Sequence, residues 1–408
     1  MTGFAGFLRD NAAWLAAGFL LTLTSGYGQT FFISVFAGEI RAEFGLSHGQ
    51  WGAIYSLGTL ASAILMIWAG TLTDRFRVRE LALAILPFFA LACLAMAVVP
   101  GAWALTLVIF ALRFAGQGMT IHVAIVAMGR WFVATRGKAL SVATLGVAMS
   151  ESLMPIIFVA LLGSFAWRSL WALAAVLILA VIPVLMLLLR HERTPQADLQ
   201  FNPATGMDGH HWTRAQVLRH WLFWCMIPMM LGTPTFVTAL FFHQVHLAEI
   251  KGLSHLSFVT LFPVYTGVSV IAMLLSGIAL DRFGTSRLLP FFLLPVAAAF
   301  LVLGTTGSLA GMAVGMALAG MTSGMNSTLP NAFWAEFYGT QHLGSIKAMA
   351  TAVMVFGSAV GPVLTGQLID LGLDFENQMI LIAIYFLLAS VLVGFAMRWA
   401  TPHLGSTA

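Results

Sequence analysis

Long apolar stretches alternate with short polar breaks along the whole chain. Each apolar stretch is about twenty residues long, the length that a helix needs to cross ~30 Å of hydrocarbon. A membrane β-barrel would instead show ~10-residue segments of alternating polarity, and the sequence has none. The pattern predicts an all-α membrane protein with about twelve transmembrane helices, at 13–37, 50–70, 80–100, 103–128, 139–162, 167–190, 221–246, 256–279, 287–305, 309–331, 348–369 and 377–397.

The composition agrees with a lipid environment. The chain is 60% hydrophobic and 8% charged, with a mean hydropathy of +0.94, whereas soluble domains carry about 25% charged residues. The net charge of +4 does not indicate a nucleic-acid partner, because the basic residues are spread over short loops. The two cysteines lie inside apolar stretches, so they predict no disulfide.

The basic residues orient the helices. If the N-terminus is cytoplasmic, most of the nineteen Lys and Arg lie at cytoplasmic helix ends, and only Arg41, Arg168 and Lys251 lie on the far side. This bias is typical of membrane proteins. It predicts a multi-pass protein of a bacterial-type inner membrane with both termini in the cytoplasm. The polar segment 191–220 then becomes a cytoplasmic linker between an N-terminal six-helix half (1–190) and a C-terminal one (221–408).

A short motif occurs twice, after the second helix of each half. GTLTDRFRVR begins at Gly70 and GIALDRFGTSR begins at Gly277, 207 residues later. Two copies at equivalent positions indicate a duplicated transporter. An acidic and a basic residue at helix ends can pair or cap helices, so a gating role is predicted for Gly70, Asp74, Arg75, Gly277, Asp281 and Arg282, against the alternative of incidental surface charges.

This motif resembles the loop motif of the major facilitator superfamily, with Arg77 where a glycine is common. The resemblance extends to the helix count, the orientation and the linker. It implies two pseudo-symmetric six-helix halves, a secondary transporter that works by alternating access, and a monomer. A membrane-embedded enzyme is the alternative of another class, but no catalytic constellation, metal site or cofactor motif supports it. Without a G-x-x-x-x-G-K-[ST] loop, the energy should come from a gradient.

Two opposite charges are predicted near the membrane midplane. Arg113 lies roughly 15 Å into the fourth helix and Glu151 roughly 20 Å into the fifth. An isolated charge there costs at least ~2.5–3.5 kcal/mol, and such residues mark functional sites by default. A static ion pair is one interpretation and a proton or substrate site is the other. Arg113 also resembles the arginine of the family's fourth-helix motif, although its spacing to Gln117 and Gly118 is one residue off.

Further polar residues inside the helices are candidates for a substrate or proton site. Each also has a structural reading, such as helix packing for Gln29 and interfacial packing for His243, and the two histidines His243 and His246 are too few for a metal site. The candidates are Tyr27, Gln29, His122, His243, Tyr265 and Asn326.

The substrate class follows from a second resemblance. FAWR at 165–168 and WAEFYGTQHLGSIKA from Trp334 resemble the branch of oxalate–formate antiporters and monocarboxylate transporters. That branch implies a small carboxylate with a proton or a second anion. Its eighth helix usually carries a basic residue, which is absent here, so Arg113 is the cation left to bind the anion. A proton-driven exporter of an amphipathic or drug-like compound is the alternative.

Overall fold

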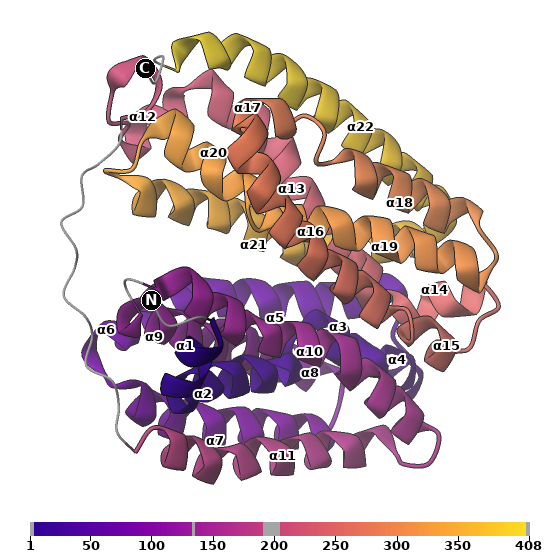
Figure 1. The fold of residues 1–408 in the computed structure, drawn as a ribbon. Coiled ribbons are helices and arrows are strands. Elements are labelled where there is room, and N and C mark those ends of the chain that lie inside the picture. The colour runs from indigo at the N-terminus through magenta and orange to yellow at the C-terminus, as the bar shows by residue number, and fades with distance from the viewer. Residues whose placement is uncertain (1–3, 133–134, 191–204, 405–408) are drawn as a thin grey trace. The chain divides into compact units, whose positions relative to one another are not determined.

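The computed structural model describes residues 4–132, 135–190 and 205–404, and every regular element in them is helical. The chain divides into two compact units, residues 1–200 and 201–408, each drawn with its helix labels in Figure 1. Part of the predicted linker, 191–204, lies outside the described residues, so its boundaries stay a prediction.

The membrane-spanning helices largely follow the apolar stretches. In unit 1 they are α5 (His48–Ala69), α7 (Val78–Ala97), α8 (Ala102–Leu112) continued by η3 (Arg113–Thr120) and α9 (Ile121–Trp131), α10 (Arg136–Leu162) and α11 (Trp167–Leu188). In unit 2 they are α13 (Trp221–Phe242), α16 (Phe262–Phe283), α18 (Leu294–Thr305), α19 (Leu309–Asn326), α21 (Leu343–Asp370) and α22 (Phe375–Ala400).

Nine helices in the described residues are long and apolar enough to cross a membrane, and a bent pair at the first predicted span makes a tenth. The predicted ninth and tenth spans are interrupted instead. The ninth consists of α17 (Thr285–Leu288) and the short α18, and the tenth of α19 and α20 (Leu329–Tyr338). Pro295 and Pro330 open α18 and α20, because proline lacks the N–H that would bond the preceding turn.

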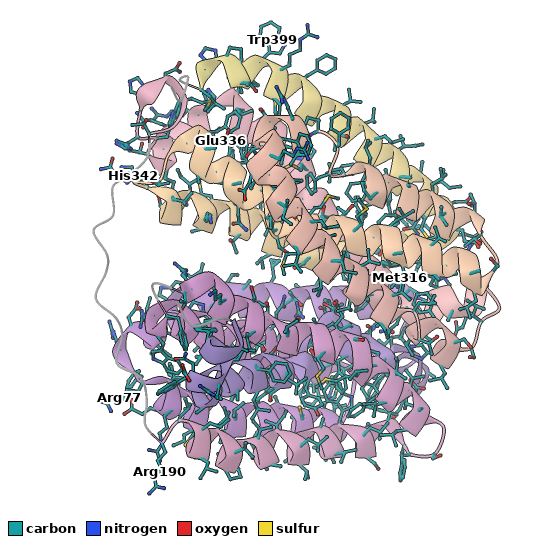
Figure 2. All side chains as sticks on the ribbon, in the orientation of Figure 1. Arg77, Arg190, Met316, Glu336, His342 and Trp399 are labelled. Atoms are coloured by element: carbon teal, nitrogen blue, oxygen red, sulfur yellow. The ribbon has the colours of Figure 1, made fainter. Side chains whose placement is uncertain are left out.

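Each unit buries small and aromatic residues between its helices and exposes large apolar ones outside. In unit 1, α7 packs along α11, and in unit 2, α16 packs along α19 (Figure 1). Trp399 points outward from α22 (Figure 2) with 72% of its surface exposed. Arg77 and Arg190 lie at one end of unit 1 (Figure 2). An apolar perimeter with charges at the ends suits a bilayer.

The first span is broken rather than continuous. α2 (Ala12–Thr24) runs into the 3₁₀ turn η1 (Ser25–Gly28), Gln29 is extended at φ −87° and ψ 156°, and helix resumes as α3 (Thr30–Ile33), η2 (Ser34–Phe36) and α4 (Ala37–Phe44). The segments on either side of Gln29 meet at 46°. The Phe32 N–H, which would reach Gly28 in a continuous helix, bonds the Gln29 carbonyl. The Gly28 carbonyl therefore needs another donor.

The fourth span contains a stretch of π-helix at η3, directly after α8. Within it, the Thr120 hydroxyl donates to the carbonyl of Ala115, five residues back, at 2.7 Å. A π-helical turn accommodates one extra residue, and such turns are frequent at functional sites. Arg113 opens this π-helical stretch and Gln117 lies within it.

The break and the π-helix touch through two glycines. A Cβ on Gly28 would lie 2.3 Å from the Leu112 carbonyl oxygen and 2.8 Å from the Cα of Gly116. A Cβ on Gly116 would lie 2.6 Å from the Cα of Gly28 and 2.6 Å from the Phe89 ring. Only glycine fits at either position, which brings the two backbones into direct contact.

We therefore expect Gly28→Ala and Gly116→Ala each to lower the midpoint of thermal unfolding of the detergent-purified protein, since overpacking typically costs about 1–3 kcal/mol. Gly267→Ala on α16 is the matched control, because a Cβ there meets nothing within 4 Å. Removing a helical glycine there should be neutral or stabilising. Equal shifts in all three variants would contradict the close contact.

Candidate functional site

The Arg113 guanidinium fills the break in the first span. It is 1% exposed, and its Nη1 donates to the Gly28 carbonyl at 3.1 Å and to the Thr30 hydroxyl at 3.4 Å. Thr30 also shares a 2.5 Å hydrogen bond with the Tyr55 hydroxyl, and the Arg113 Cζ lies 5.3 Å from the centre of the Tyr55 ring. One arm of the guanidinium therefore supplies the donor that the broken helix lacks.

The other edge of the same guanidinium carries a buried Nε, which has no hydrogen-bond partner among the described residues. A buried donor without a partner costs about 1–3 kcal/mol, or more for a charged group. A guanidinium edge presents two parallel N–H groups that match a carboxylate. Nε therefore lacks a partner among the described residues while Nη1 bonds the first span.

Glu151 lies on α10, which packs against the first span. Its side chain is half-buried, and the neighbouring Ser150 is fully buried. A Cβ on Gly26 would lie 2.6 Å from the Ser150 Cβ, so η1 packs against α10 as well as against η3. The fourth and fifth spans contact each other through α9 and α10, as expected for neighbouring helices, and the first span contacts both near Arg113 and Glu151. Their pairing stays a prediction.

Tyr27 lies just before the break in the first span, and Gln29 lies at the break. Tyr27 is 7% exposed and belongs to an aromatic cluster, with its ring centre 5.1 Å from that of Phe32 and 6.1 Å from that of Phe158. The Gln29 side chain is half-buried at the bend itself. Tyr27 thus belongs to an aromatic cluster between the first span and α10.

Three of the predicted site residues, His243, Tyr265 and Asn326, belong to unit 2. His243 lies between α13 and α14 (Gln244–Ile250), is 3% exposed, and its Nε2 is 3.3 Å from the Pro362 carbonyl oxygen on α21. The Tyr265 hydroxyl donates to the Ser323 hydroxyl at 2.6 Å, and Asn326 is half-buried one turn later on α19. No group of three or more His, Cys, Asp or Glu among the described residues could hold a metal ion.

The position in unit 2 that corresponds to Arg113 carries no charge. α8 begins at Ala102 and α19 at Leu309, which again differ by 207, so Gly320 corresponds to Arg113. A Cβ on Gly320 would lie 2.2 Å from the Tyr265 carbonyl oxygen. Helix packing occupies the space that a long side chain would need, and the cationic site belongs to unit 1.

The first copy of the repeated motif is held by an arginine that sequence reasoning did not single out. Asp74 forms an ion pair with Arg130, whose Nη1 also donates to the Thr73 carbonyl at 2.5 Å. His122 lies at the same loop, with its Nε2 3.1 Å from the Gly70 carbonyl oxygen. The position of Arg130 in the last turn of α9 could have suggested this pairing. His122 thus contacts the motif loop rather than the Arg113 site.

The second copy lacks such a partner. Asp281 and Arg282 are exposed, and Asp281 forms no ion pair within the described parts of the chain. α20, which ends the fourth span of unit 2, contains no basic residue. Arg282 lies over the ring of Phe283 at 5.4 Å. The two copies match in sequence but not in contacts.

The chain matches a family and several known proteins. The family model described as Major Facilitator Superfamily matches residues 18–362 and 260–407. The 3-(3-hydroxy-phenyl)propionate transporter of Escherichia coli (strain K12) is 25% identical over 351 residues, covering 82% of each chain. The inward-facing, unoccupied structure of a bacterial homologue of the human lysosomal transporter Spinster matches with a TM-score of 0.75 at 16% identity, covering 98% of this chain and 99% of that one. The nucleoside transporter NupG matches with a TM-score of 0.69 at 14% identity, covering 96% and 98%. At these identities the two structures share the fold.

The two copies of the motif loop differ in their contacts, and this difference leads to a prediction for one variant in each copy. Asp74→Asn should slow substrate uptake without weakening substrate binding, because it removes the anion that Arg130 holds. Asp281→Asn is the matched control and should behave like the parent. Initial uptake rates in proteoliposomes and equilibrium binding to the purified protein separate the two effects. Parallel losses of binding and uptake, or equal defects in both variants, would count against a gating role for Asp74.

Proposed function

Because the chain belongs to the Major Facilitator Superfamily and is therefore a multi-pass membrane transporter rather than an enzyme, we propose that it is a proton-coupled secondary transporter of small organic anions. Its preferred substrates are carboxylates that carry an aromatic ring. Transport follows alternating access of the two six-helix halves. The protein works as a monomer in a bacterial-type inner membrane, with both termini in the cytoplasm.

The Arg113 site carries the proposal for an anion. A guanidinium with 1% exposure is costly in a membrane, and its protein partners are the neutral groups of Gly28 and Thr30. Among the described residues, no ion pair balances the charge of Arg113. A substrate carboxylate on the free Nε edge would supply both the missing charge and the missing hydrogen bond.

The surroundings of Arg113 and the comparisons support an aromatic carboxylate. The Tyr55 ring lies beside the guanidinium, and Tyr27 brings further rings to the break. Aromatic side chains stack on aromatic ligands in offset or edge-to-face geometry. The Escherichia coli relative transports an arylpropionate, and the resemblance to the monocarboxylate branch also implies an acid. The relative's substrate and the resemblance to the monocarboxylate branch both support a carboxylate as the substrate.

Glu151 is the proposed proton carrier. It is an acidic residue deep in a membrane helix, one residue from Ser150, which packs on the first span. In the neutral form, Glu151 would leave the local charge balance to Arg113 and the bound anion. Protonation would therefore favour anion binding, and release of the proton would favour anion release. Symport of one proton with the acid follows from this coupling.

An uptake panel tests the substrate class. We expect proteoliposomes to accumulate 3-phenylpropionate or its 3-hydroxy derivative faster under an inward proton gradient, and expect no acceleration for nucleosides. Arg113→Gln should reduce this uptake by about tenfold or more, since hydrogen bonds to charged groups contribute about 1.5–3 kcal/mol. Arg398→Gln, at an exposed residue of α22, is the matched control. Uptake of uncharged compounds alone, or unchanged uptake in Arg113→Gln, would overturn the proposal.

The coupling role of Glu151 makes a separate prediction. The parent should bind 3-phenylpropionate more tightly as the pH falls, whereas Glu151→Gln should bind it with little dependence on pH. Binding titrations at several pH values measure this directly. Glu336→Gln, at an exposed carboxylate of α20, should keep the parental profile. A pH dependence that survives Glu151→Gln would assign the proton to another group.

A further inference from the structure

Three spans of unit 1 meet at a cluster of charges on its outer end, the end opposite the Gly70 loop. Arg168, in the first turn of α11, donates to the Glu43 carboxylate at 2.6 Å through Nη2. The same guanidinium donates to the carbonyls of Ala97 at 3.0 Å and Val99 at 2.9 Å, at the end of α7. Trp167 adds a 2.8 Å hydrogen bond to Glu43. These residues form the outer clamp of unit 1, which joins α4, α7 and α11.

Unit 2 has a similar cluster with the charges exchanged. Lys251 directly follows α14, and its Nζ lies 2.5 Å from the Glu376 carboxylate at the start of α22. The same ammonium donates to the Gly304 carbonyl, in the last turn of α18, at 3.2 Å. The Lys251 side chain is 3% exposed, so it depends on these two partners to offset its desolvation. These residues form the outer clamp of unit 2.

The two clamps occupy the same place in the repeat. The four residues Gly-Leu-Ser-His occur at 45–48 and again at 252–255, 207 residues apart. Gly45 and Gly252 both have positive φ, 62° and 65°, and both serines accept a hydrogen bond from the third residue of the following helix. Ala97 and Gly304, whose carbonyls the clamps bind, are also separated by 207.

The order of charges is nevertheless reversed. In unit 1 the anion, Glu43, lies at the outer end of the first span, and the cation, Arg168, opens the sixth. In unit 2 the cation, Lys251, follows the seventh span, and the anion, Glu376, opens the twelfth. The constant element is a cation on the carbonyls that end the third span of each unit. Those carbonyls carry the negative end of the helix dipole and lack helical donors. A cation can reach them from either neighbouring span, but an anion cannot replace it.

We propose that Arg168 and Lys251 are positioning residues for the transport site, each holding the outer piece of a span whose helix is interrupted, the first at Gln29 and the seventh at His243, where α13 ends and α14 begins. In unit 1 that piece continues from Thr30, which bonds Arg113, to Glu43. In unit 2 it is α14, which starts next to His243. The link to transport rests on the proposed function, whereas the clamp itself does not. A fixed outer piece keeps Thr30 and His243 in place while the span bends at its break.

Cys93 reports on the clamp of unit 1 without any substrate. It is fully buried on α7, one turn before Ala97, and in a Cys225→Ser background it is the sole thiol of the chain. We expect Glu43→Gln and Arg168→Gln to speed its modification by a small methanethiosulfonate reagent several-fold in membranes. Lys251→Gln, the matched change in unit 2, should leave the rate unchanged. Unchanged rates in both unit 1 variants would overturn the proposal.

Charge exchange separates a clamp from a simple ion pair. In Glu43→Arg with Arg168→Glu the pair is restored, but a carboxylate then faces the Ala97 and Val99 carbonyls, so Cys93 should stay quickly modified. Arg168→Lys should stay slow, because Lys251 holds its carbonyl with an ammonium. Full protection in the exchanged variant would reduce the clamp to an ion pair. If the exchanged variant is not produced in the membrane, the rates of Cys93 modification in Arg168→Lys and Arg168→Gln are compared instead. Equal rates in these two variants would contradict the clamp.

The reciprocal experiment tests unit 2. With both native cysteines changed to serine, Ala297→Cys places a thiol at a buried position of α18. Lys251→Gln should accelerate its modification and Glu43→Gln should not. Uptake of 3-phenylpropionate then tests the positioning role, with a raised KM expected in Glu43→Gln and recovery in Glu43→Asp. An unchanged KM beside faster modification would refute the positioning role. Absence of uptake in the parent would refute the proposed function and leave the modification test valid.

Discussion

The hydrogen bond from Arg113 to the Gly28 carbonyl is the interaction on which the candidate site depends. In hydrocarbon a backbone carbonyl without a partner costs several kcal/mol, so the first span can break at Gln29 only where another group donates to the freed carbonyl. Arg113 makes this bond at 3.1 Å. The contact between Gly28 and Gly116 lets the two backbones approach closely enough, and Arg113 is the first residue of the π-helical stretch that follows α8.

The same arrangement explains why a charge can persist at this depth. Nη1 satisfies the first span, while Nε has no partner among the described residues and is the group proposed to meet the substrate. A substrate anion would complete the site rather than displace its support. Unit 2 has a glycine at the corresponding position, where Gly320 packs directly on the Tyr265 backbone. The two units share a fold and a repeat, but their polar sites differ.

Sequence reasoning predicted the helical membrane fold, because spans of about twenty apolar residues leave few alternatives. It also identified Arg113 as an unusual charge. It did not foresee the break at Gln29 or the interruptions of the ninth and tenth spans, since apolar composition alone does not report helix continuity. The unusual spacing after Arg113 was visible in the sequence, but the π-helical stretch that the structure has there was not predicted.

Contacts between distant helices were harder to foresee than positions along them. Asp74 pairs with Arg130 on the fourth span, whereas the sequence predicted only that acidic and basic residues at the helix ends can pair. The repeated Gly-Leu-Ser-His at 45–48 and 252–255 was a further signal, which could have located both outer clamps. The reversed charges concealed the equivalence, because a search for matching residues passes over Glu43 and Lys251.

The central claim is that Arg113 binds a carboxylate while it supports the first span. Calorimetric titration of the purified protein in lipid nanodiscs with 3-phenylpropionate and with the uncharged, nearly isosteric 3-phenylpropanamide tests it most directly. If Arg113 holds the carboxylate, the parent should bind the acid about tenfold or more tightly than the amide, and Arg113→Gln should no longer distinguish them. Equal affinities for acid and amide in the parent, or a preference for the acid that survives in Arg113→Gln, would contradict it.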